Sequence, residues 1–94
     1  MTFDEADSTG PTADASACCN QQPGPAAGLP GETGPGGGRI GTVLISPFIR
    51  PHTVSNVPYN HYSTLATIED LFGLPKLGEA ATTSSTFGHD VFDR

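Results

Sequence analysis

The chain has 94 residues, and its ten acidic and four basic side chains give a formal net charge of −6 at pH 7. The basic residues are scattered, so we expect no nucleic-acid partner, because binding a phosphate backbone needs concentrated positive charge. No apolar run approaches the ~20 residues that span a bilayer. Residues 1–20 lack the basic start and apolar stretch of a signal peptide, which predicts that the chain as it stands remains in the cytoplasm.

The chain begins with residues typical of a strand and continues directly into two carboxylates. Thr2 and Phe3 favour the end of a buried parallel strand over residues 1–5, and Asp4 and Glu5 close it. Ligands collect at the carboxyl ends of strands in open α/β sheets, and carboxylates are hard oxygen ligands for divalent cations. Asp4 and Glu5 are therefore candidate metal ligands, and the alternative is a solvated acidic terminus.

Residues 6–38 are rich in glycine and proline and nearly free of large apolar side chains. Eight of the twelve glycines and five of the nine prolines lie in residues 10–38. This composition predicts a loop or linker without regular structure, with an active-site lid as the functional alternative. Cys18 and Cys19 are adjacent and lack the C-x-x-C spacing of a zinc or redox site. They are expected to pair with other cysteines or stay free, and a bond between them is the less common alternative.

Residues 39–47 predict a strand, and residues 61–72 predict a helix. The run Ile40, Val43, Leu44 and Ile45 is continuously apolar, which indicates burial on both faces of a parallel or mixed sheet. Prolines at 47, 51 and 58 bar a helix from the loop that follows.

In the predicted helix, Leu65, Ile68, Leu71 and Phe72 recur on one face. Asn60 or Ser63 is expected to be the N-cap, and Gly73 the residue after the helix. We expect Leu65, Ile68 and Phe72 to pack on the strand, and we expect a short turn near residues 89–92.

His61 stands at the start of the predicted helix, after a loop set by prolines. A protonated imidazole at a helix N-terminus favours an anion, so His61 is a candidate for positioning a phosphate group. The alternative is a role in capping the helix and packing the loop.

Several short segments, in this order, resemble one family. They are TFDE at 2–5, the glycine run up to Arg39, VLISP at 43–47, YNHYS at 59–63 and TIEDLFGL at 67–74. Together they are similar to the C-terminal part of the bacterial phosphoesterase family, within the alkaline phosphatase superfamily. That family includes acid phosphatases, phospholipases C and phosphatidylinositol-3-phosphatase-like enzymes. The resemblance implies an α/β fold, the C-terminal fragment of an α/β/α sandwich: residues 1–5 end a truncated strand, 6–38 form the loop, and 39–94 form the strand, loop, helix and tail.

The resemblance also implies a function for the parent protein. The parent would hydrolyse phosphate monoesters, with phosphoinositide or phospholipid headgroups as further candidates, and would be secreted or held in the cell envelope. Asp4 and Glu5 would bind a divalent metal, and His61 would position the phosphate site, although Asn60 stands where many relatives have Asp. The nucleophile would come from outside these residues, so we expect the chain to be inactive alone. The alternative is a small acidic interaction module, not an enzyme, whose exposed apolar faces favour self-association.

Overall fold

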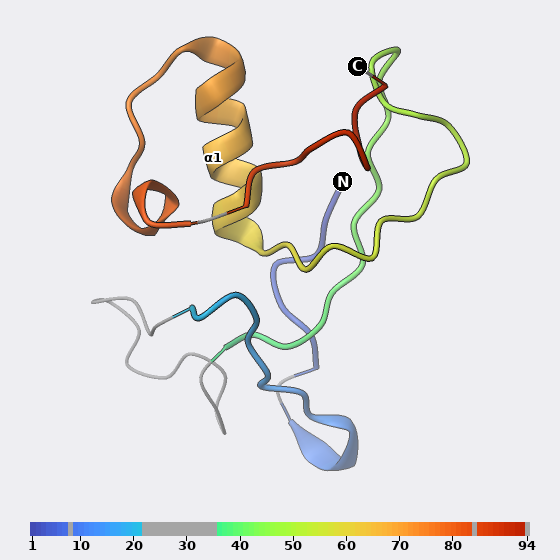
Figure 1. Cartoon of the computed structure of the whole chain (residues 1–94). Helices are drawn as coiled ribbons and strands as arrows, with labels where there is room; N and C mark the ends of the chain where they lie inside the picture. Colours follow the sequence, from blue (N-terminus) through green and yellow to red (C-terminus); the bar gives the residue numbers. More distant parts are fainter. Residues whose placement is uncertain (8, 22–35, 84, 94) are drawn as a thin grey trace. The chain divides into compact units, whose positions relative to one another are not determined.

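The computed structural model describes residues 1–7, 9–21, 36–83 and 85–93. It contains a 3-10 helix η1 (Gly10–Thr12), an α-helix α1 (His61–Phe72) and a second 3-10 helix η2 (Gly78–Ala81) (Figure 1). The chain divides into two compact units, Met1–Leu44 and Ile45–Arg94. Each is described below by itself.

In the first unit, the amino-terminal segment pairs with the segment that follows the glycine run. Thr2 and Thr42 form an isolated antiparallel bridge, and their hydroxyl oxygens lie 2.7 Å apart. The Val43 N–H donates to the Met1 carbonyl at 2.8 Å, and farther along the Ala6 N–H donates to the Gly37 carbonyl at 2.7 Å. These contacts hold two irregular segments together without making a ladder.

Residues 39–47 do not form a continuous strand in this structure, so the prediction of a strand there is wrong. Among the described residues, only Thr42 of this segment takes part in a bridge, and the side chains of Val43 and Ile45 are exposed. Residues 1–5 likewise contribute one bridge, at Thr2. A strand that is apolar on both faces is stable only between neighbouring strands and covering layers. The paired segment here provides neither.

A second pairing in this unit brings residues 14–16 against residues 36–39. The Gly36 and Gly38 N–H groups donate to the Ala15 and Ser16 carbonyls, each at 3.0 Å. A Cβ on Gly36 would lie 2.6 Å from the Ser16 carbonyl oxygen, so this approach requires glycine. The prediction of no regular structure in residues 10–38 is wrong at η1, which is a 3-10 helix. Residues 22–35, which the same prediction covers, lie outside the described residues.

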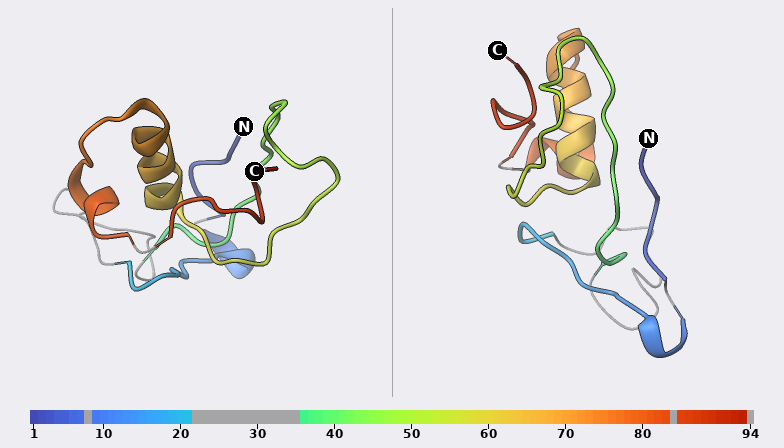
Figure 2. Two further views of the ribbon diagram at one scale, coloured as in Figure 1. Left: turned by 45° about the horizontal axis from the view of Figure 1, so that its top comes forward. Right: turned by 90° about the vertical axis from the view of Figure 1, so that its right-hand side faces the viewer.

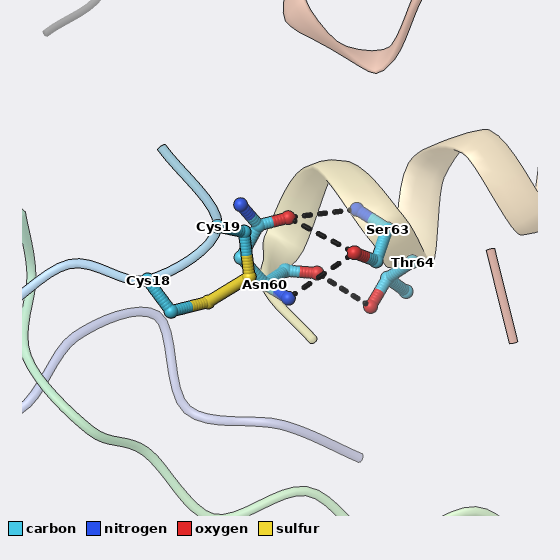
Figure 3. The surroundings of a disulfide bond; sticks show 5 residues. All are labelled: Cys18, Cys19, Asn60, Ser63 and Thr64. Atoms are coloured by element: carbon cyan, nitrogen blue, oxygen red, sulfur yellow. Dashed lines mark hydrogen bonds between the residues drawn. A yellow bond between two sulfur atoms is a disulfide. The ribbon is translucent and has the colours of Figure 1, made fainter. Parts of the chain in front are cut away.

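The second unit is built on α1, whose predicted bounds and caps are confirmed. The Asn60 side chain accepts a hydrogen bond from the Ser63 N–H at 2.9 Å, and the Ser63 hydroxyl accepts one from the Asn60 N–H at 3.3 Å (Figure 3). This reciprocal pair is a capping box. Gly73 ends the helix in the left-handed conformation, with φ of 63°. The helix is thus fixed by local sequence at both ends.

The side of α1 that is buried is the polar and small side. Ala66 is 0% exposed and Glu69 2%, and Ser63 and Thr67 are also buried. By contrast, Leu65, Ile68 and Phe72 are 37%, 45% and 75% exposed, and Leu71 is exposed as well. The prediction that the apolar side packs inward is therefore wrong for this chain, because the segments that cover α1 present backbone groups and hydrogen bonds to its polar side. We call Leu65, Ile68, Leu71 and Phe72 the apolar stripe.

The chain after α1 turns back along the helix (Figures 1 and 2). The Leu77 N–H donates to Glu69 Oε1 at 3.0 Å. Lys76 Nζ donates to the Ala66 carbonyl and lies 2.7 Å from Asp70 Oδ1. Because these bonds all reach the same side of the helix, the loop and η2 cover Ala66 and Glu69.

Residues 85–93 add a second cover to this unit. The Phe87 N–H donates to the Thr67 hydroxyl at 2.9 Å, and the Phe87 ring meets the Tyr59 ring edge-on with centroids 4.9 Å apart. Ile49 and Phe92 form an isolated antiparallel bridge. The predicted turn near 89–92 is confirmed, since the N–H groups of Val91 and Phe92 both donate to the Gly88 carbonyl.

No helix in the part of the chain that the structure describes is long and apolar enough to cross a membrane.

Candidate functional site

Asp4 and Glu5, the candidate metal ligands, both lie on the surface of the first unit. Asp4 occupies a bend directly after the paired residues, and the Glu5 Cβ lies close to Gly37. Two adjacent exposed carboxylates are chemically suited to a divalent cation, which takes six or more oxygen ligands. Among residues with a described position, no group of three or more His, Cys, Asp or Glu side chains converges to complete such a shell. The pair therefore fits a metal only as part of its ligand set.

The other two carboxylates of this unit, Asp7 and Asp14, are engaged in holding the loops. Asp7 accepts from the Thr12 hydroxyl at 2.6 Å and from the Thr9 N–H at 3.1 Å, and these bonds lower its pKa. Asp14 accepts from the N–H groups of Arg39 and Ser16, each at 2.9 Å. The bond from Arg39, followed by those from Ser16, lowers the pKa of Asp14 to about 2. Both groups are thus structural rather than candidate ligands.

His61 is the first residue of α1 and is exposed. Positions separated by four, seven and eleven residues share one side of a helix, so His61 lies in line with Leu65, Ile68 and Phe72. His61 therefore stands at the amino-terminal end of the apolar stripe. His61 belongs to the second unit and the Asp4–Glu5 pair to the first.

Asn60 takes part in the helix cap through its side chain and its backbone carbonyl. Its side-chain oxygen accepts from the Ser63 N–H and from the Ser63 hydroxyl at 3.1 Å. The Asn60 carbonyl accepts from the Thr64 N–H at 3.2 Å. Asparagine is among the best N-cap residues, so Asn60 suits the helix start.

A polar cluster centred on Asp90 was not predicted from sequence. Tyr59 Oη donates to Asp90 Oδ1 at 2.8 Å, Ser55 Oγ donates to Asp90 Oδ2, and the Gly88 N–H donates to Tyr59 Oη at 3.3 Å. The Ser55 hydroxyl lowers the pKa of Asp90 most, while burial and the Asp90 carboxylate raise the pKa of Tyr59. These hydrogen bonds join residues that are 29 to 35 positions apart and follow no motif, so no sequence signal could have found the cluster.

His52 and the cysteine pair also have a definite geometry. His52 follows Pro51 with φ of 55°, the left-handed conformation that glycine adopts most readily. His52 therefore occupies a turn position that glycine would suit. Cys18 and Cys19 form a disulfide with each other (Figure 3), rather than pairing elsewhere or staying free as expected.

Comparison with known proteins shows the family to which the chain belongs. A search of curated proteins and a search of solved structures found no significant match. A family model, described as the Phosphoesterase family, matches residues 1–75. This match covers most of the chain and includes Asp4, Glu5, Asn60 and His61. The chain belongs to the Phosphoesterase family.

Proposed function

We propose that this chain supplies part of the active region of an enzyme that hydrolyses phosphate monoesters. The observation that carries the proposal is the family match over residues 1–75, which includes all three candidate site residues. Phosphoinositides and phospholipid headgroups are the more specific substrates that the resemblance suggests. The proposed setting is an α/β/α sandwich, in which further strands of the parent would cover the apolar stripe.

Asp4 and Glu5 are proposed to hold a divalent metal together with ligands from additional polypeptide. When bound, such an ion neutralises charge on phosphate oxygens and lowers the barrier to displacement. The support from this chain is that Asp4 and Glu5 are adjacent and both exposed, with Asp4 at a bend.

His61 is proposed to position the phosphate group from the N-terminus of α1. The partial positive charge of a helix N-terminus and an imidazolium both favour an anion. The support is that α1 begins at His61 with its cap complete, so the exposed imidazole is held on a well-defined helix end. If further strands of the parent cover the apolar stripe, the His61 imidazole would lie at the end of the surface that they bury.

The nucleophile is proposed to lie in polypeptide outside these 94 residues, which makes this chain inactive alone. The test compares hydrolysis of an aryl phosphate by this chain and by a longer product of the same reading frame, with Mg²⁺, Mn²⁺ or Zn²⁺ and with a chelator. We expect negligible turnover by the chain and turnover by the longer product that falls at least tenfold on Asp4→Ala, as loss of one metal ligand would cause. Turnover by the chain alone, or a longer enzyme indifferent to Asp4→Ala and Glu5→Ala, contradicts the assignment.

The metal assignment can be tested on the chain itself. Mn²⁺ broadens the NMR signals of nuclei near its site, so we expect the amides of residues 3–6 to broaden first. The double variant Asp4→Asn, Glu5→Gln should lose this broadening, and the matched variant Asp14→Asn should keep it. Broadening centred on Asp14, or unchanged in the double variant, would assign the ion elsewhere.

The His61 assignment has an internal control in the other two histidines. Inorganic phosphate is expected to shift the ring signals of His61 more than those of His52 and His89. Equal shifts at all three histidines would indicate general salt effects and would contradict a phosphate site at His61.

The exposed apolar stripe favours a second candidate, a small acidic interaction module that associates with itself. The two acidic residues next to the apolar stripe place no exposed, unpaired charge beside it, because Glu69 is buried and Asp70 is paired with Lys76. Sedimentation over a range of concentrations tests this candidate: dimers that Ile68→Glu dissociates would support it. Dimerisation without catalysis by any longer product would favour the module over the phosphoesterase.

A further inference from the structure

The Cys18–Cys19 disulfide closes the shortest loop a disulfide can close, because its two cysteines are neighbours in sequence. A disulfide stabilises a fold mainly by restricting the unfolded chain, and that effect grows with the length of the closed loop. This bond also joins no two elements of the first unit. Its contribution to global stability is therefore small, and its role must be local.

The local backbone around the bond is unusual. Cys19 and Asn20 have φ of 65° and 58°, and the Gln21 N–H donates to the Cys18 carbonyl at 3.1 Å. Positive φ at both central residues is the pattern of a type I′ turn, which favours glycine and asparagine. Asn20 suits its position, but a left-handed conformation costs a residue such as Cys19 roughly 1–2 kcal/mol. The covalent ring holds Cys19 in a conformation that an open chain disfavours.

We propose that Cys18 and Cys19 form a reversible thiol–disulfide exchange site, whose oxidation state sets the conformation of the turn at residues 18–21. Both cysteines are only half-buried, so a small reductant or an exposed dithiol on a protein can reach them. Disulfides that are strained or accessible are the labile ones in proteins. The co-reactant is a dithiol, and the inference is independent of the proposed phosphoesterase function.

The exchange balances as a two-electron reaction. One thiolate of the dithiol attacks a sulfur of the Cys18–Cys19 bond, which breaks that bond and forms a mixed disulfide, and the released cysteine takes up a proton. The second sulfur of the dithiol, as a thiolate, then attacks the first sulfur of the same dithiol in the mixed disulfide and closes the dithiol's own disulfide. The second cysteine leaves as a thiol, and the dithiol leaves as a disulfide, so two electrons and two protons have passed to the cysteine pair.

Reduction is expected to open the turn. Without the ring, the disfavoured φ of Cys19 is no longer imposed, and the Gln21 amide loses its bond to the Cys18 carbonyl. A difference of about 1.4 kcal/mol is tenfold in an equilibrium constant, so exchange of the Gln21 amide should rise on the order of tenfold. The amides of Gly36 and Gly38, bonded to Ala15 and Ser16 upstream, serve as internal references.

The experiment measures amide exchange in the full chain, untreated, after dithiothreitol, and after reoxidation. Alkylation with iodoacetamide counts thiols in the same samples, and phenylarsine oxide, which bridges two adjacent thiols, should bind only the reduced chain. We expect no alkylation before reduction, two groups per chain afterwards, faster exchange at Gln21, and recovery on reoxidation. Free thiols in the untreated chain, a disulfide between chains, or exchange at Gln21 unaffected by reduction would overturn the proposal.

Two variants separate the ring from the side chains. Cys19→Gly cannot form the bond but accepts positive φ, so its Gln21 amide should stay protected and insensitive to dithiothreitol. The double variant Cys18→Ser, Cys19→Ser should exchange as the reduced chain does in either condition. If the double variant protects Gln21 as well as the oxidised chain does, the disulfide does not set the turn and the proposal fails.

Discussion

The Tyr59 hydroxyl lies 2.8 Å from Asp90 Oδ1, and this hydrogen bond joins the loop before α1 to the tail after it. Ser55 donates to the other oxygen of the same carboxylate, and the Gly88 N–H donates to the Tyr59 hydroxyl. Asp90 thus connects segments that are about 30 positions apart in sequence. The cluster is one of the polar contacts that hold the tail in place in the second unit, beside the hydrogen bonds from Phe87 to Thr67 and from Asp93 to Phe48.

Tyr59→Phe is expected to remove this connection while keeping the ring contact with Phe87. Loss of a hydrogen bond of this kind costs about 1 kcal/mol, and the Asp90 oxygen and the Gly88 N–H are left without it. Amide exchange at Val91 and Phe92 should accelerate. The matched control is Tyr62→Phe, at the only other tyrosine, which should leave those amides unchanged. Equal effects from both variants would show that the tail is held by other contacts.

The first unit should loosen in acid through Asp14, whose pKa is lowered from 3.8 to about 2 by the Arg39 and Ser16 N–H groups. A depressed carboxyl pKa adds stability that is present above the unfolded value and is lost as pH falls through the folded value. Protection of the Arg39 amide should therefore decline between about pH 4 and pH 2. Carboxyl titration by NMR checks this, with Asp14→Asn as the variant that should abolish the pH dependence. A midpoint near 4 would contradict the prediction.

Gly38→Ala should disrupt the pairing of residues 14–16 with 36–39 more than Gly10→Ala disrupts η1. Both glycines have positive φ, 79° and 78°, so each substitution carries the left-handed cost of about 1–2 kcal/mol. A Cβ at Gly38 would in addition run into the Asp14 carbonyl and lie 2.7 Å from the Ala6 Cβ, whereas nothing lies within 4 Å at Gly10. Exchange of the Arg39 amide reports on the pairing, and exchange of the Ala13 amide, which is bonded to the Gly10 carbonyl, reports on η1. Equal responses would mean that the close approach is easily relieved.

Substitutions on the two sides of α1 should follow the observed burial rather than the apolar pattern. Ile68→Gln is expected to change stability by no more than about 0.5 kcal/mol, since Ile68 is 45% exposed. Ala66→Leu should cost about 1–3 kcal/mol, because Ala66 is fully enclosed and a larger side chain overpacks the site. Thermal unfolding followed by circular dichroism compares them. A large loss with Ile68→Gln would show that the stripe is buried in solution, as in a self-associated chain.

Asn60→Ala should shorten or weaken α1 by removing one half of the capping box. Loss of an N-cap of this type costs about 0.5–2 kcal/mol. The conservative variant Asn60→Asp keeps an oxygen that accepts from the Ser63 N–H, so it should preserve helicity. Helical circular dichroism measures both. A loss on Asn60→Asp as large as on Asn60→Ala would show that the oxygen acceptor is not what supports the helix start.

The sequence predicted α1 and its caps because those features depend on residues close together in the chain. Asn60, Ser63 and Gly73 carry their roles locally, so the bounds followed from spacing. Which side of the helix is buried could not be predicted in this way. Thr67 and Glu69 are covered because the Phe87 and Leu77 N–H groups reach them, and no local pattern encodes those partners.

The family was also predictable from sequence, since the order of short segments resembled the phosphoesterases and the family match confirms it. The segment 39–47 was wrongly predicted as a strand, because its apolar composition suits a sheet, whereas the described residues form only one isolated bridge with it, at Thr42. The roles of Asp4, Glu5 and His61 stay predictions. They rest on residue chemistry and family membership, because the described residues bring no group of three or more His, Cys, Asp or Glu side chains together around the Asp4–Glu5 pair.

The family match and the packing of the second unit end at different places. The match stops at Pro75, yet Lys76 bonds the Ala66 carbonyl and Phe87 bonds the Thr67 hydroxyl. A polypeptide cut at the family boundary would keep all of α1 but would open the side of the helix that carries Ala66 and Glu69 to water. The stretch that matches the family therefore does not include all the residues that cover α1. Grafting this helix into another protein would require carrying the tail through residue 93 along with it.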